Sequence, residues 1–437
     1  MLYHSGSRAA AAATSRIGED VWVDPQTVAS LSAPRAWSLL QSLPEYDEDS
    51  ALALGTRLRA EGYEPALVAA LLTQSRLRAK GRTKFGDRVD EMLLTPDGVE
   101  QATRWQLAAR HAQRFAAAGV EVVWDLGCGL GGDALALADA GLSVELVDAD
   151  PATAAVAAVN VRDVPRARVR TARIEDLDLA AAPGTGAWLD PGRRLSGRRD
   201  GSGRAIRTLA LDQLSPTWEQ VQSVAARVGP VGAKLAPAFP HAAVPGGVEA
   251  QWASFGGEAL ECTLWWGDLV HHAGRTAQVH VGPTGAAGPW VEVEDDGGGP
   301  ARTTSGADDV GDWLYEPDRA VLQAGLTGVL ARTVTGTETA PGAGYVTTTK
   351  KTDIPWARRF RVLSVHPIRT KPLRRWARER DLGRLTIKKR GVALDPDRLR
   401  HDLHLSGSRE AVVVLSQLGG RSMLIEVEPQ PQPEPTG

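Results

Sequence analysis

The stretch that decides the fold is Val122-Val-Trp-Asp125-Leu-Gly127-Cys-Gly129-Leu-Gly131-Gly132-Asp133, an apolar run that ends in an acid and turns through glycines. An Ala/Leu-rich segment with a helical pattern follows it. This order of strand, glycine turn and helix is typical of a nucleotide-type cofactor site. A second run, Ser143-Val-Glu-Leu-Val-Asp148-Ala-Asp150-Pro151, also ends in carboxylates. Together the two runs predict the first half of an αβ cofactor domain.

The charge beside the glycines distinguishes between cofactors. Gly127, Gly129 and Gly132 also satisfy the G-x-G-x-x-G spacing of dinucleotide folds, and that spacing alone is a weak signal. A dinucleotide fold directs backbone N–H groups at a pyrophosphate, which Asp125 would repel. S-adenosylmethionine (SAM) has no phosphate and carries a sulfonium and an ammonium, which an acid attracts. The sequence therefore favours SAM, with a dinucleotide site or a purely structural glycine turn as alternatives.

These two runs resemble the first two motifs of the class I SAM-dependent methyltransferases, the second being followed by a helix that reaches Asn160. The resemblance implies a set of cofactor-binding residues: Asp125, Gly127, Gly129 and Gly131 around the methionine portion, Asp148 at the ribose and Asp176 at the adenine. Glu175 and Asp178 lie beside Asp176, and any of the three could face the ring. The resemblance also implies that the segment leading into the domain, residues 84–104, closes over the cofactor.

Substrate chemistry is expected after the predicted fourth strand, because ligands of parallel sheets bind at the carboxyl ends of strands. The residues there are Asp190-Pro191-Gly192-Arg193-Arg194. We expect Asp190 to orient the acceptor or take its proton, and Arg193 to bind a substrate phosphate. Arg194, and Lys234 at the end of a predicted fifth strand, would bind the same anionic substrate. The alternative is that Asp190 caps the loop while the arginines pair with surface carboxylates.

The Asp-Pro-x-Arg-Arg form resembles a bacterial methyltransferase family with a THUMP-like C-terminal domain. Gly192 stands where many nucleic-acid aminomethylases have a second proline, so the resemblance does not imply N-methylation. His366-Pro367 and the run Leu385-Thr-Ile387-Lys388-Lys389-Arg390-Gly391-Val392 resemble the THUMP-like signature. Ser416-Gln417 stands where that family has a Thr-Arg pair, so one basic contact is absent.

The C-terminal region is also strongly basic, although the whole chain has a net charge of only −3. Between Arg358 and Arg390 the only acids are Glu379 and Asp381. A basic region in a near-neutral chain is typical of nucleic-acid binding, and a solvated surface is the alternative. THUMP-type domains are associated with RNA, chiefly tRNA, so the resemblance implies an RNA partner. Lys388, Lys389 and Arg390 are the expected substrate contacts in this region.

At 437 residues the chain is too long for one compact core. We expect an α/β Rossmann-like class I methyltransferase sheet with an N-terminal helical region and C-terminal α+β domains. The expected parts are an N-terminal helical region (1–95), the methyltransferase domain (96–245), a ferredoxin-like module (246–350), the basic THUMP-like domain (351–428) and a disordered tail (429–437). Within the module, the residues around Gly256-Gly257 alternate like a β-hairpin with a bulged turn.

Composition excludes several other classes of protein. No apolar run is long enough to span a membrane and no signal-peptide core is present, so we expect a cytoplasmic protein. Cys128 and Cys262 cannot form a disulfide framework, and the nine histidines show no metal-binding spacing.

The favoured function is therefore SAM-dependent methylation of RNA, either tRNA or rRNA. Two alternatives remain: methylation of an anionic small molecule or a protein, and nucleic-acid binding by a degenerate, non-enzymatic cofactor fold. Retention of both Asp125 and Asp148 argues against the second alternative.

Overall fold

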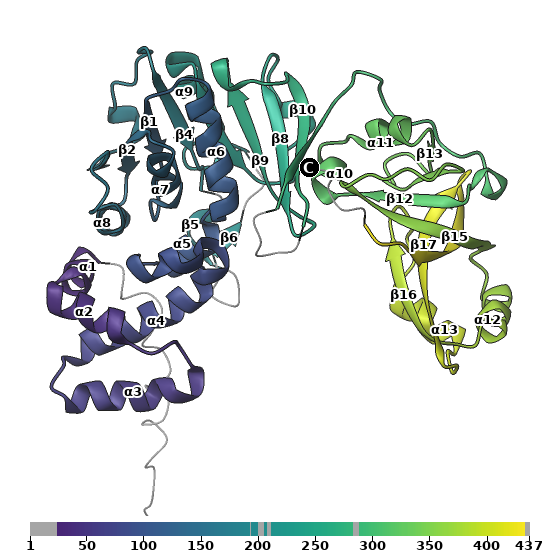
Figure 1. Ribbon diagram of the computed structural model, residues 1–437, viewed down its shortest axis with the longest axis horizontal. Coiled ribbons are helices and arrows are strands. Elements are labelled where there is room, and N and C mark those ends of the chain that lie inside the picture. The colour runs from purple at the N-terminus through teal and green to yellow at the C-terminus, as the bar shows by residue number, and fades with distance from the viewer. Residues whose placement is uncertain (1–23, 193, 200–204, 208–210, 283–287, 433–437) are drawn as a thin grey trace, which may run out of the picture. The chain divides into compact units, whose positions relative to one another are not determined.

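The computed structural model describes residues 24–192, 194–199, 205–207, 211–282 and 288–432 (Figure 1). The chain forms two compact units. The first contains residues 1–194 and 214–231, and the second contains residues 195–213 and 232–437.

The first unit begins with a helical region, as the sequence predicts. Proline occupies the first position of several of its helices, where its missing N–H has no cost. Asp24 caps the first helix by accepting from the N–H groups of Gln26 and Thr27 at 2.8 and 2.9 Å. The helices are α1 (Pro25–Ser32), α2 (Pro34–Ser42), α3 (Glu48–Ala60), α4 (Pro65–Phe85), α5 (Pro96–Gln101) and α6 (Trp105–Ala117), with a 3₁₀ turn, η1 (Gly86–Glu91), after α4.

The strands of the first unit form a parallel sheet in the order β4-β1-β2-β3. They are β1 (Val122–Leu126), β2 (Ser143–Asp148), β3 (Ala167–Thr171) and β4 (Thr185–Leu189). The helices that accompany them are α7 (Gly132–Asp139), α8 (Pro151–Asn160) and α9 (Trp218–Val228). In the register Asp125 lies opposite Leu146 and Trp188. The carboxyl ends of β1, β2 and β4 therefore share one edge, which confirms the expected Rossmann-like arrangement.

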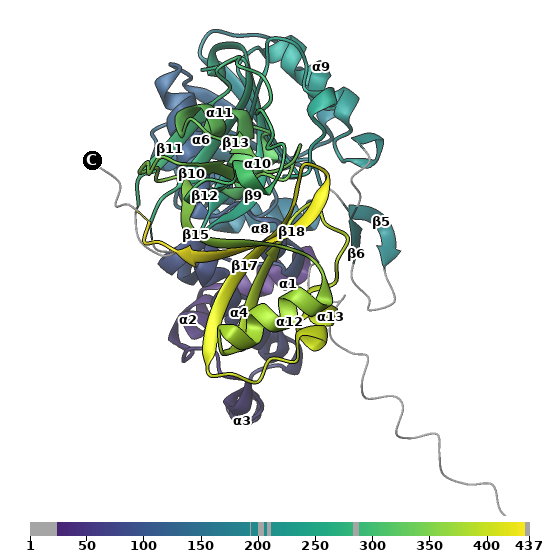
Figure 2. The same cartoon turned by 90° about the vertical axis from the view of Figure 1, so that its right-hand side faces the viewer.

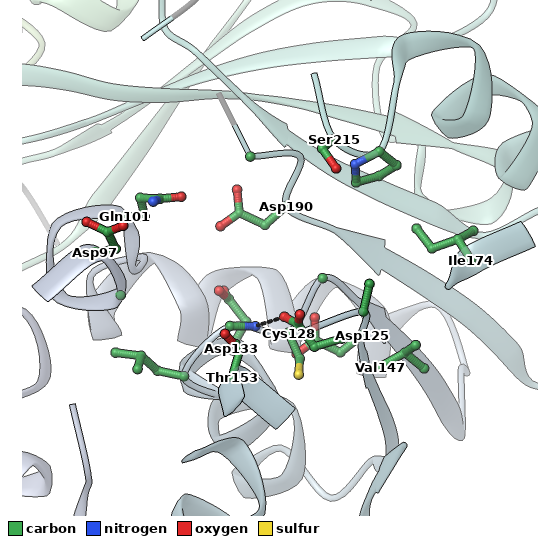
Figure 3. Close-up of a pocket in the computed structure, with 18 of the residues that line it drawn as sticks. Asp97, Gln101, Asp125, Cys128, Asp133, Val147, Thr153, Ile174, Asp190 and Ser215 are labelled. Atoms are coloured by element: carbon green, nitrogen blue, oxygen red, sulfur yellow. Dashed lines mark hydrogen bonds between the residues drawn. The ribbon is translucent and has the colours of Figure 1, made fainter. Parts of the chain in front are cut away.

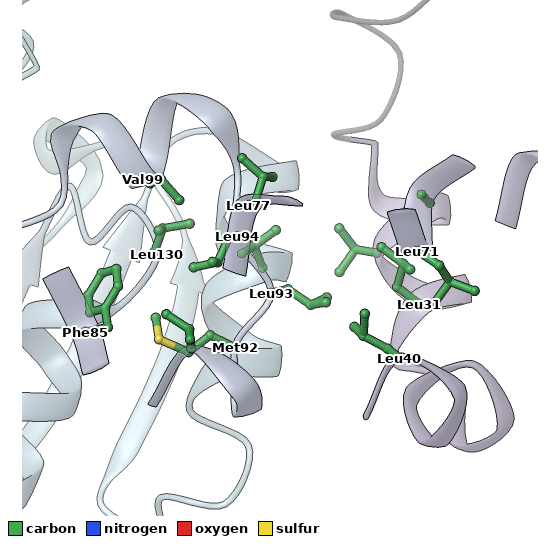
Figure 4. Close-up of a cluster of buried hydrophobic side chains, with 14 residues drawn as sticks. Leu31, Leu40, Leu71, Leu77, Phe85, Met92, Leu93, Leu94, Val99 and Leu130 are labelled. Carbon is green, nitrogen blue, oxygen red and sulfur yellow. The ribbon is translucent and has the colours of Figure 1, made fainter. Parts of the chain in front are cut away.

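An apolar cluster joins the helical region to this sheet domain (Figure 4). It contains Leu31 and Leu40 from α1 and α2, and Leu71 from α4, all almost fully buried. Leu130 of the glycine turn and Val156 of α8 belong to the same cluster. The helical region thus shares a core with the segment that forms the expected cofactor site.

The second unit contains the two-stranded sheet of β5 (Arg194–Arg199) and β6 (Ala205–Arg207) and contributes strands to two larger sheets. In the first of the larger sheets, its strands have the order β11-β10-β8-β9-β7. Its strands are β7 (Val231–Leu235), β8 (Glu249–Phe255), β9 (Glu258–Trp266), β10 (Gly274–His280) and β11 (Trp290–Glu294). The predicted hairpin is confirmed: β8 and β9 are antiparallel with a register shift at Ala253, and Gly256 and Gly257 turn the chain at φ values of +62° and +77°.

The second sheet has the order β13-β14-β12-β15-β18-β17-β16. Its strands are β12 (Trp313–Pro317), β13 (Thr337–Glu338), β14 (Val346–Thr348), β15 (Ala357–Pro367), β16 (Leu382–Lys389), β17 (Arg409–Leu418) and β18 (Arg421–Pro429). The associated helices are α10 (Arg319–Gln323), α11 (Thr327–Thr333), α12 (Thr370–Glu379) and α13 (Pro396–Leu403). Helices α12 and α13 lie together and pack Leu373, Trp376, Leu399 and Leu403 on the sheet (Figure 2).

The residues expected to form a separate ferredoxin-like module, 246–350, divide between these two sheets. Strands β8 to β11 belong to the first sheet, and β12 to β14 belong to the second. β12 pairs with β15 through Leu314 and Phe360, so a boundary at residue 350 falls inside a hydrogen-bonded sheet. Local periodicity does not show which distant strand will be the partner of β12.

Within the described ranges, we find no helix that is both long and apolar enough to cross a membrane.

Candidate active site

A pocket of about 440 Å³ opens at the carboxyl ends of β1, β2 and β4 in the first unit (Figure 3). This volume falls in the range of small-molecule and cofactor sites. Its walls come from α5, the glycine turn, the end of β2, the segment after β3, the loop after β4 and the start of α9. The site therefore lies where open parallel sheets bind their ligands.

The glycine turn and the end of β2 are held together by backbone and carboxylate contacts. Gly127 adopts a φ of +87° and Gly129 a φ of +54°, a region that side chains disfavour. Gly129 donates its N–H to Oδ2 of Asp148 at 3.2 Å, and Asp150 donates its N–H to Oδ1 at 2.9 Å. Each carboxylate oxygen can accept a second hydrogen bond. Asp148 can thus bind a pair of hydroxyl groups in the pocket while it stays fixed by the turn.

Burial changes the acidity of two groups in this turn. It raises the pKa of Asp148 above its ordinary value, although the N–H groups of Asp150 and Gly129 oppose the shift. Burial also raises the pKa of the Cys128 thiol well above its usual range, and the charges of Asp125 and Asp148 add to the effect. The Cys128 thiol consequently stays protonated, which fits a small residue filling the turn and not a nucleophile.

Two further acids face the pocket from the glycine motif. Asp125 is the penultimate residue of β1 and is only 1% exposed. Asp133 lies in the first turn of α7, where the helix dipole favours a negative charge. Thr103 donates its hydroxyl to Oδ2 of Asp133 at 2.9 Å, and Nδ1 of His111 lies 3.7 Å from Oδ1. The pocket therefore offers carboxylates that attract a cationic ligand.

The loop after β4 brings Asp190 to the same pocket. Gly192 and Ser215 exchange two backbone hydrogen bonds of 2.7 and 3.1 Å, which hold this loop against the segment before α9. A methyl group built on Gly127 would lie 3.6 Å from the backbone oxygen of Asp190. Figure 3 shows the Asp190 carboxylate directed into the pocket.

Glu175, and not Asp176, lines the pocket among the three acids that follow β3. Glu175 accepts from Nε2 of Gln220 at 2.7 Å and from Arg173 at 3.3 Å. Asp176 is exposed at the end of the short turn Ile174–Asp176. Glu175 is therefore better placed than Asp176 to face an adenine ring.

The remaining cofactor and loop residues predicted from the sequence are placed as follows. Gly131 caps the start of α7 with a φ of +76° and does not line the pocket. Arg193 lies outside the described residues, and only the backbone of Arg194, in strand β5 (Arg194–Arg199), is described. Lys234 is buried in β7 and is not among the residues that line this pocket.

Of the three basic substrate contacts predicted in the THUMP-like domain, two bind an acid of their own unit. Nζ of Lys388 donates to Oε2 of Glu316 at 2.7 Å, and Nη2 of Arg390 donates to Oε1 at 3.2 Å. The three residues form an ion triad, with Glu316 on β12, Lys388 on β16 and Arg390 directly after β16, and Glu316 is only 9% exposed. Lys389 is exposed and donates to the backbone oxygen of Leu394 at 2.8 Å. Only Lys389 presents an exposed side chain.

The pocket residues in and beside α5 lie within the segment 84–104 that the resemblance places over the cofactor, although it singles out none of them individually. Thr95, Asp97, Gly98 and Gln101 all line the pocket. The Thr-Pro-Asp-Gly pattern does predict a helix start, and the Thr95 hydroxyl accepts from the N–H of Gly98 at 2.8 Å. Which side chains of this segment reach the pocket depends on tertiary contacts that no local pattern carries.

Across the residues with described positions, no three His, Cys, Asp or Glu side chains gather in a way that could hold a metal ion.

Comparison with known proteins also indicates a SAM-dependent methyltransferase with a THUMP-like domain. Residues 357–429 match the family described as THUMP domain-like, and residues 24–81 match a domain of unknown function (DUF8688). An uncharacterized S-adenosylmethionine-dependent methyltransferase of Mycobacterium tuberculosis is 28% identical over 383 residues, covering 84% of this chain and 96% of the relative.

A solved structure shares the fold. The crystal structure of a candidate methyltransferase from Porphyromonas gingivalis W83 superposes with a TM-score of 0.63 at 15% identity, covering 89% of this chain and all of that one. The predicted resemblance to SAM-dependent methyltransferases with a THUMP-like C-terminal domain is confirmed.

Proposed function

We propose that this protein transfers the methyl group of SAM to an RNA bound by its THUMP-like domain. The enzyme class and the cofactor follow from the relationship to the mycobacterial methyltransferase, as the sequence predicted. One observation supports RNA as the acceptor: the THUMP-like match covers the most basic part of the chain. Both features occur on one chain whose two units are each compact.

The pocket fits the cofactor in charge and in hydrogen-bonding capacity. SAM, when bound, supplies a methyl group that its sulfonium has already activated. Asp148 would accept hydrogen bonds from the two ribose hydroxyls, because each of its oxygens binds only one backbone N–H. Asp125, with Gly127 and Gly129, would face the cationic methionine portion. Glu175 would face the adenine at the opposite end.

Asp190 would act on the acceptor. Its carboxylate is directed into the pocket from a loop that Ser215 fixes, so it can orient an acceptor group and take its proton. Most of the rate enhancement would come from alignment in a closed pocket. Arg193 and Arg194 follow Asp190 directly in the sequence and are proposed to bind a phosphate of the substrate.

The structure reduces the set of basic residues that could contact RNA. Arg359 pairs with Asp353, Arg380 with Glu426, and Lys388 and Arg390 with Glu316, so these charges have partners inside the unit. Exposed basic side chains remain on neighbouring elements: Lys371, Arg375 and Arg378 on α12, Arg384 and Lys389 on β16, and Arg398 on α13. Two of them, Arg375 and Arg384, pair with the exposed acids Glu379 and Glu410 at the surface, where such pairs contribute little.

A groove on the THUMP-like domain lies between β16 and the end of α13. Arg384, Arg400, His401 and His404 line it together with apolar residues, and no carboxylate is among its lining residues. Arg374 of α12 donates to the backbone oxygen of Asp402 and contacts Nε2 of His404, which ties α12 to the same groove. Arg384 and Arg400 also pair with exposed acids, Glu410 at 3.2 Å and Asp397 at 2.6 Å, so a phosphate backbone bound in this groove would compete with these carboxylates for the two guanidinium groups.

The test is titration of tRNA against the full chain at rising salt concentration. RNA binding through phosphates predicts that log affinity falls linearly and steeply with log salt. A flat dependence, or no binding, would indicate that the basic surface only keeps the domain solvated.

A further inference from the structure

An extended segment, residues 92–94, connects η1 to α5 and is held by buried side chains of α4. Gln74 accepts from the N–H of Leu94 at 2.9 Å and donates to its backbone oxygen at 2.8 Å. Arg78 donates from Nε and Nη2 to the backbone oxygen of Met92 at 3.2 and 3.1 Å. Gln74 is 0% exposed and Arg78 is 6% exposed. Two polar side chains of α4 thus replace the strand partner that this segment lacks.

Asn160, the last residue of α8, holds the same segment from the opposite side. It accepts from the N–H of Leu93 at 2.7 Å and donates to the backbone oxygen of Leu93 at 2.9 Å. Its other N–H donates to the backbone oxygen of Leu130, in the glycine turn, at 2.9 Å. Asn160 is 8% exposed, and its amide oxygen and both amide N–H groups each have a partner. The segment is therefore fixed both to the N-terminal helices and to the turn that forms the pocket.

The segment leads directly into α5, which forms one wall of the pocket. A methyl group built on Gly98 would lie 2.5 Å from Cγ of Leu130, so α5 lies directly on the glycine turn. At the far end of α5, Nζ of Lys84 donates to the backbone oxygens of Glu100 and Ala102 at 2.8 and 2.6 Å. Helix α4 thus holds α5 at both ends, through Gln74 before it and Lys84 after it.

We propose that the N-terminal helical domain, the part that matches a family without an assigned function, positions the α5 wall of the cofactor pocket. Gln74, Arg78 and Asn160 are the positioning residues, and they act through Thr95, Asp97, Gly98 and Gln101. This inference rests on the proposed SAM site. It gives the helical domain a role in cofactor affinity in addition to its packing role.

The test compares three variants of the full chain by SAM calorimetry and thermal unfolding. Gln74→Met keeps a similar side-chain volume but removes both hydrogen bonds to Leu94, so α5 gains freedom that SAM binding must remove. We expect SAM affinity to fall about tenfold, which corresponds to about 1.4 kcal/mol. Gly98→Ala displaces α5 without touching the helical domain, and we expect a loss of similar size. Leu58→Ala is the matched control, because Leu58 is a buried residue of α3 outside the cluster that contains residues 92–94.

The control separates positioning from general stability. Leu58→Ala should lower the unfolding temperature as much as Gln74→Met does, yet leave SAM affinity within twofold of wild type. Equal SAM affinity in Gln74→Met and wild type would overturn the inference while leaving the proposed function intact. An equal loss of affinity in Leu58→Ala would also overturn it, because destabilisation alone would then explain the effect. Failure of the wild-type chain to bind SAM would instead contradict the proposed function.

Discussion

Replacing Asp148 by Asn should weaken SAM binding more than any other isosteric change in the pocket. The carboxylate binds the N–H groups of Gly129 and Asp150 and, in our proposal, both ribose hydroxyls. An asparagine side chain has one acceptor oxygen in place of two and no charge. At least one ribose hydroxyl would therefore lose its acceptor, and the other would keep only a neutral hydrogen bond.

The size of the loss follows from these contacts. A hydrogen bond to a charged group contributes about 1.5–3 kcal/mol, compared with about 0.5–1.5 kcal/mol for a neutral one. Losing one charged bond gives about 1.5–3 kcal/mol, or a roughly 10- to 150-fold higher Kd for SAM. Calorimetric titration of wild type and Asp148→Asn with SAM measures this directly. A change below about threefold would refute the ribose role of Asp148.

Because the pKa of Asp148 is raised, both SAM affinity and the stability of the fold should depend on pH, each in a definite direction. SAM needs the ionised carboxylate as acceptor, so SAM affinity should fall as pH falls through the raised pKa. The folding stability of the chain without SAM should depend on pH in the opposite direction. Since folding raises this pKa, protonated Asp148 contributes stability that is complete below the unfolded-state pKa and is lost as pH rises through the folded-state value. In Asp148→Asn, SAM affinity should no longer fall at low pH. If the fall at low pH persisted in this variant, another group would be responsible for it.

Three other substitutions test separate parts of the molecule. Asp190→Asn should leave SAM affinity within about twofold but lower the rate of methyl transfer by about 100-fold, as single-turnover kinetics would measure, if Asp190 acts as general base. Arg384→Gln should reduce the slope of log RNA affinity against log salt by about one, and an unchanged slope would exclude a phosphate contact there. Glu316→Gln leaves Lys388 and Arg390 close together without their counter-charge, so urea unfolding should show the second unit losing about 3 kcal/mol. An unchanged midpoint would mean that the triad adds no net stability.

Much of the fold could be predicted because its signals are local. The glycine turn after β1 needs positive φ values at Gly127 and Gly129, and only glycine adopts these readily. The strands and helices of the C-terminal domain, β15 to β18 with α12 and α13, lie in short periodic runs of the sequence. Local periodicity and capping are sufficient for such elements.

The parts that could not be predicted depend on residues far apart in the chain. From the sequence, Lys388 and Arg390 are expected to be available to bind the substrate. Their acid partner, Glu316, lies more than 70 positions earlier, so no local pattern indicates the pairing. The choice between Glu175 and Asp176 depends on how the turn after β3 faces Gln220 of α9. The role of Gln74 in holding Leu94 also has no sequence pattern, because a buried amide on a helix resembles any other polar residue.

The most direct test of the central claim is transfer of a labelled methyl group from SAM into total RNA by the purified full chain. SAM-dependent RNA methylation predicts label in an RNA fraction that is sensitive to ribonuclease, with loss of the label in Asp190→Asn. Label that appears only in protein or small molecules, or no transfer by a chain that binds SAM, would contradict RNA as the acceptor.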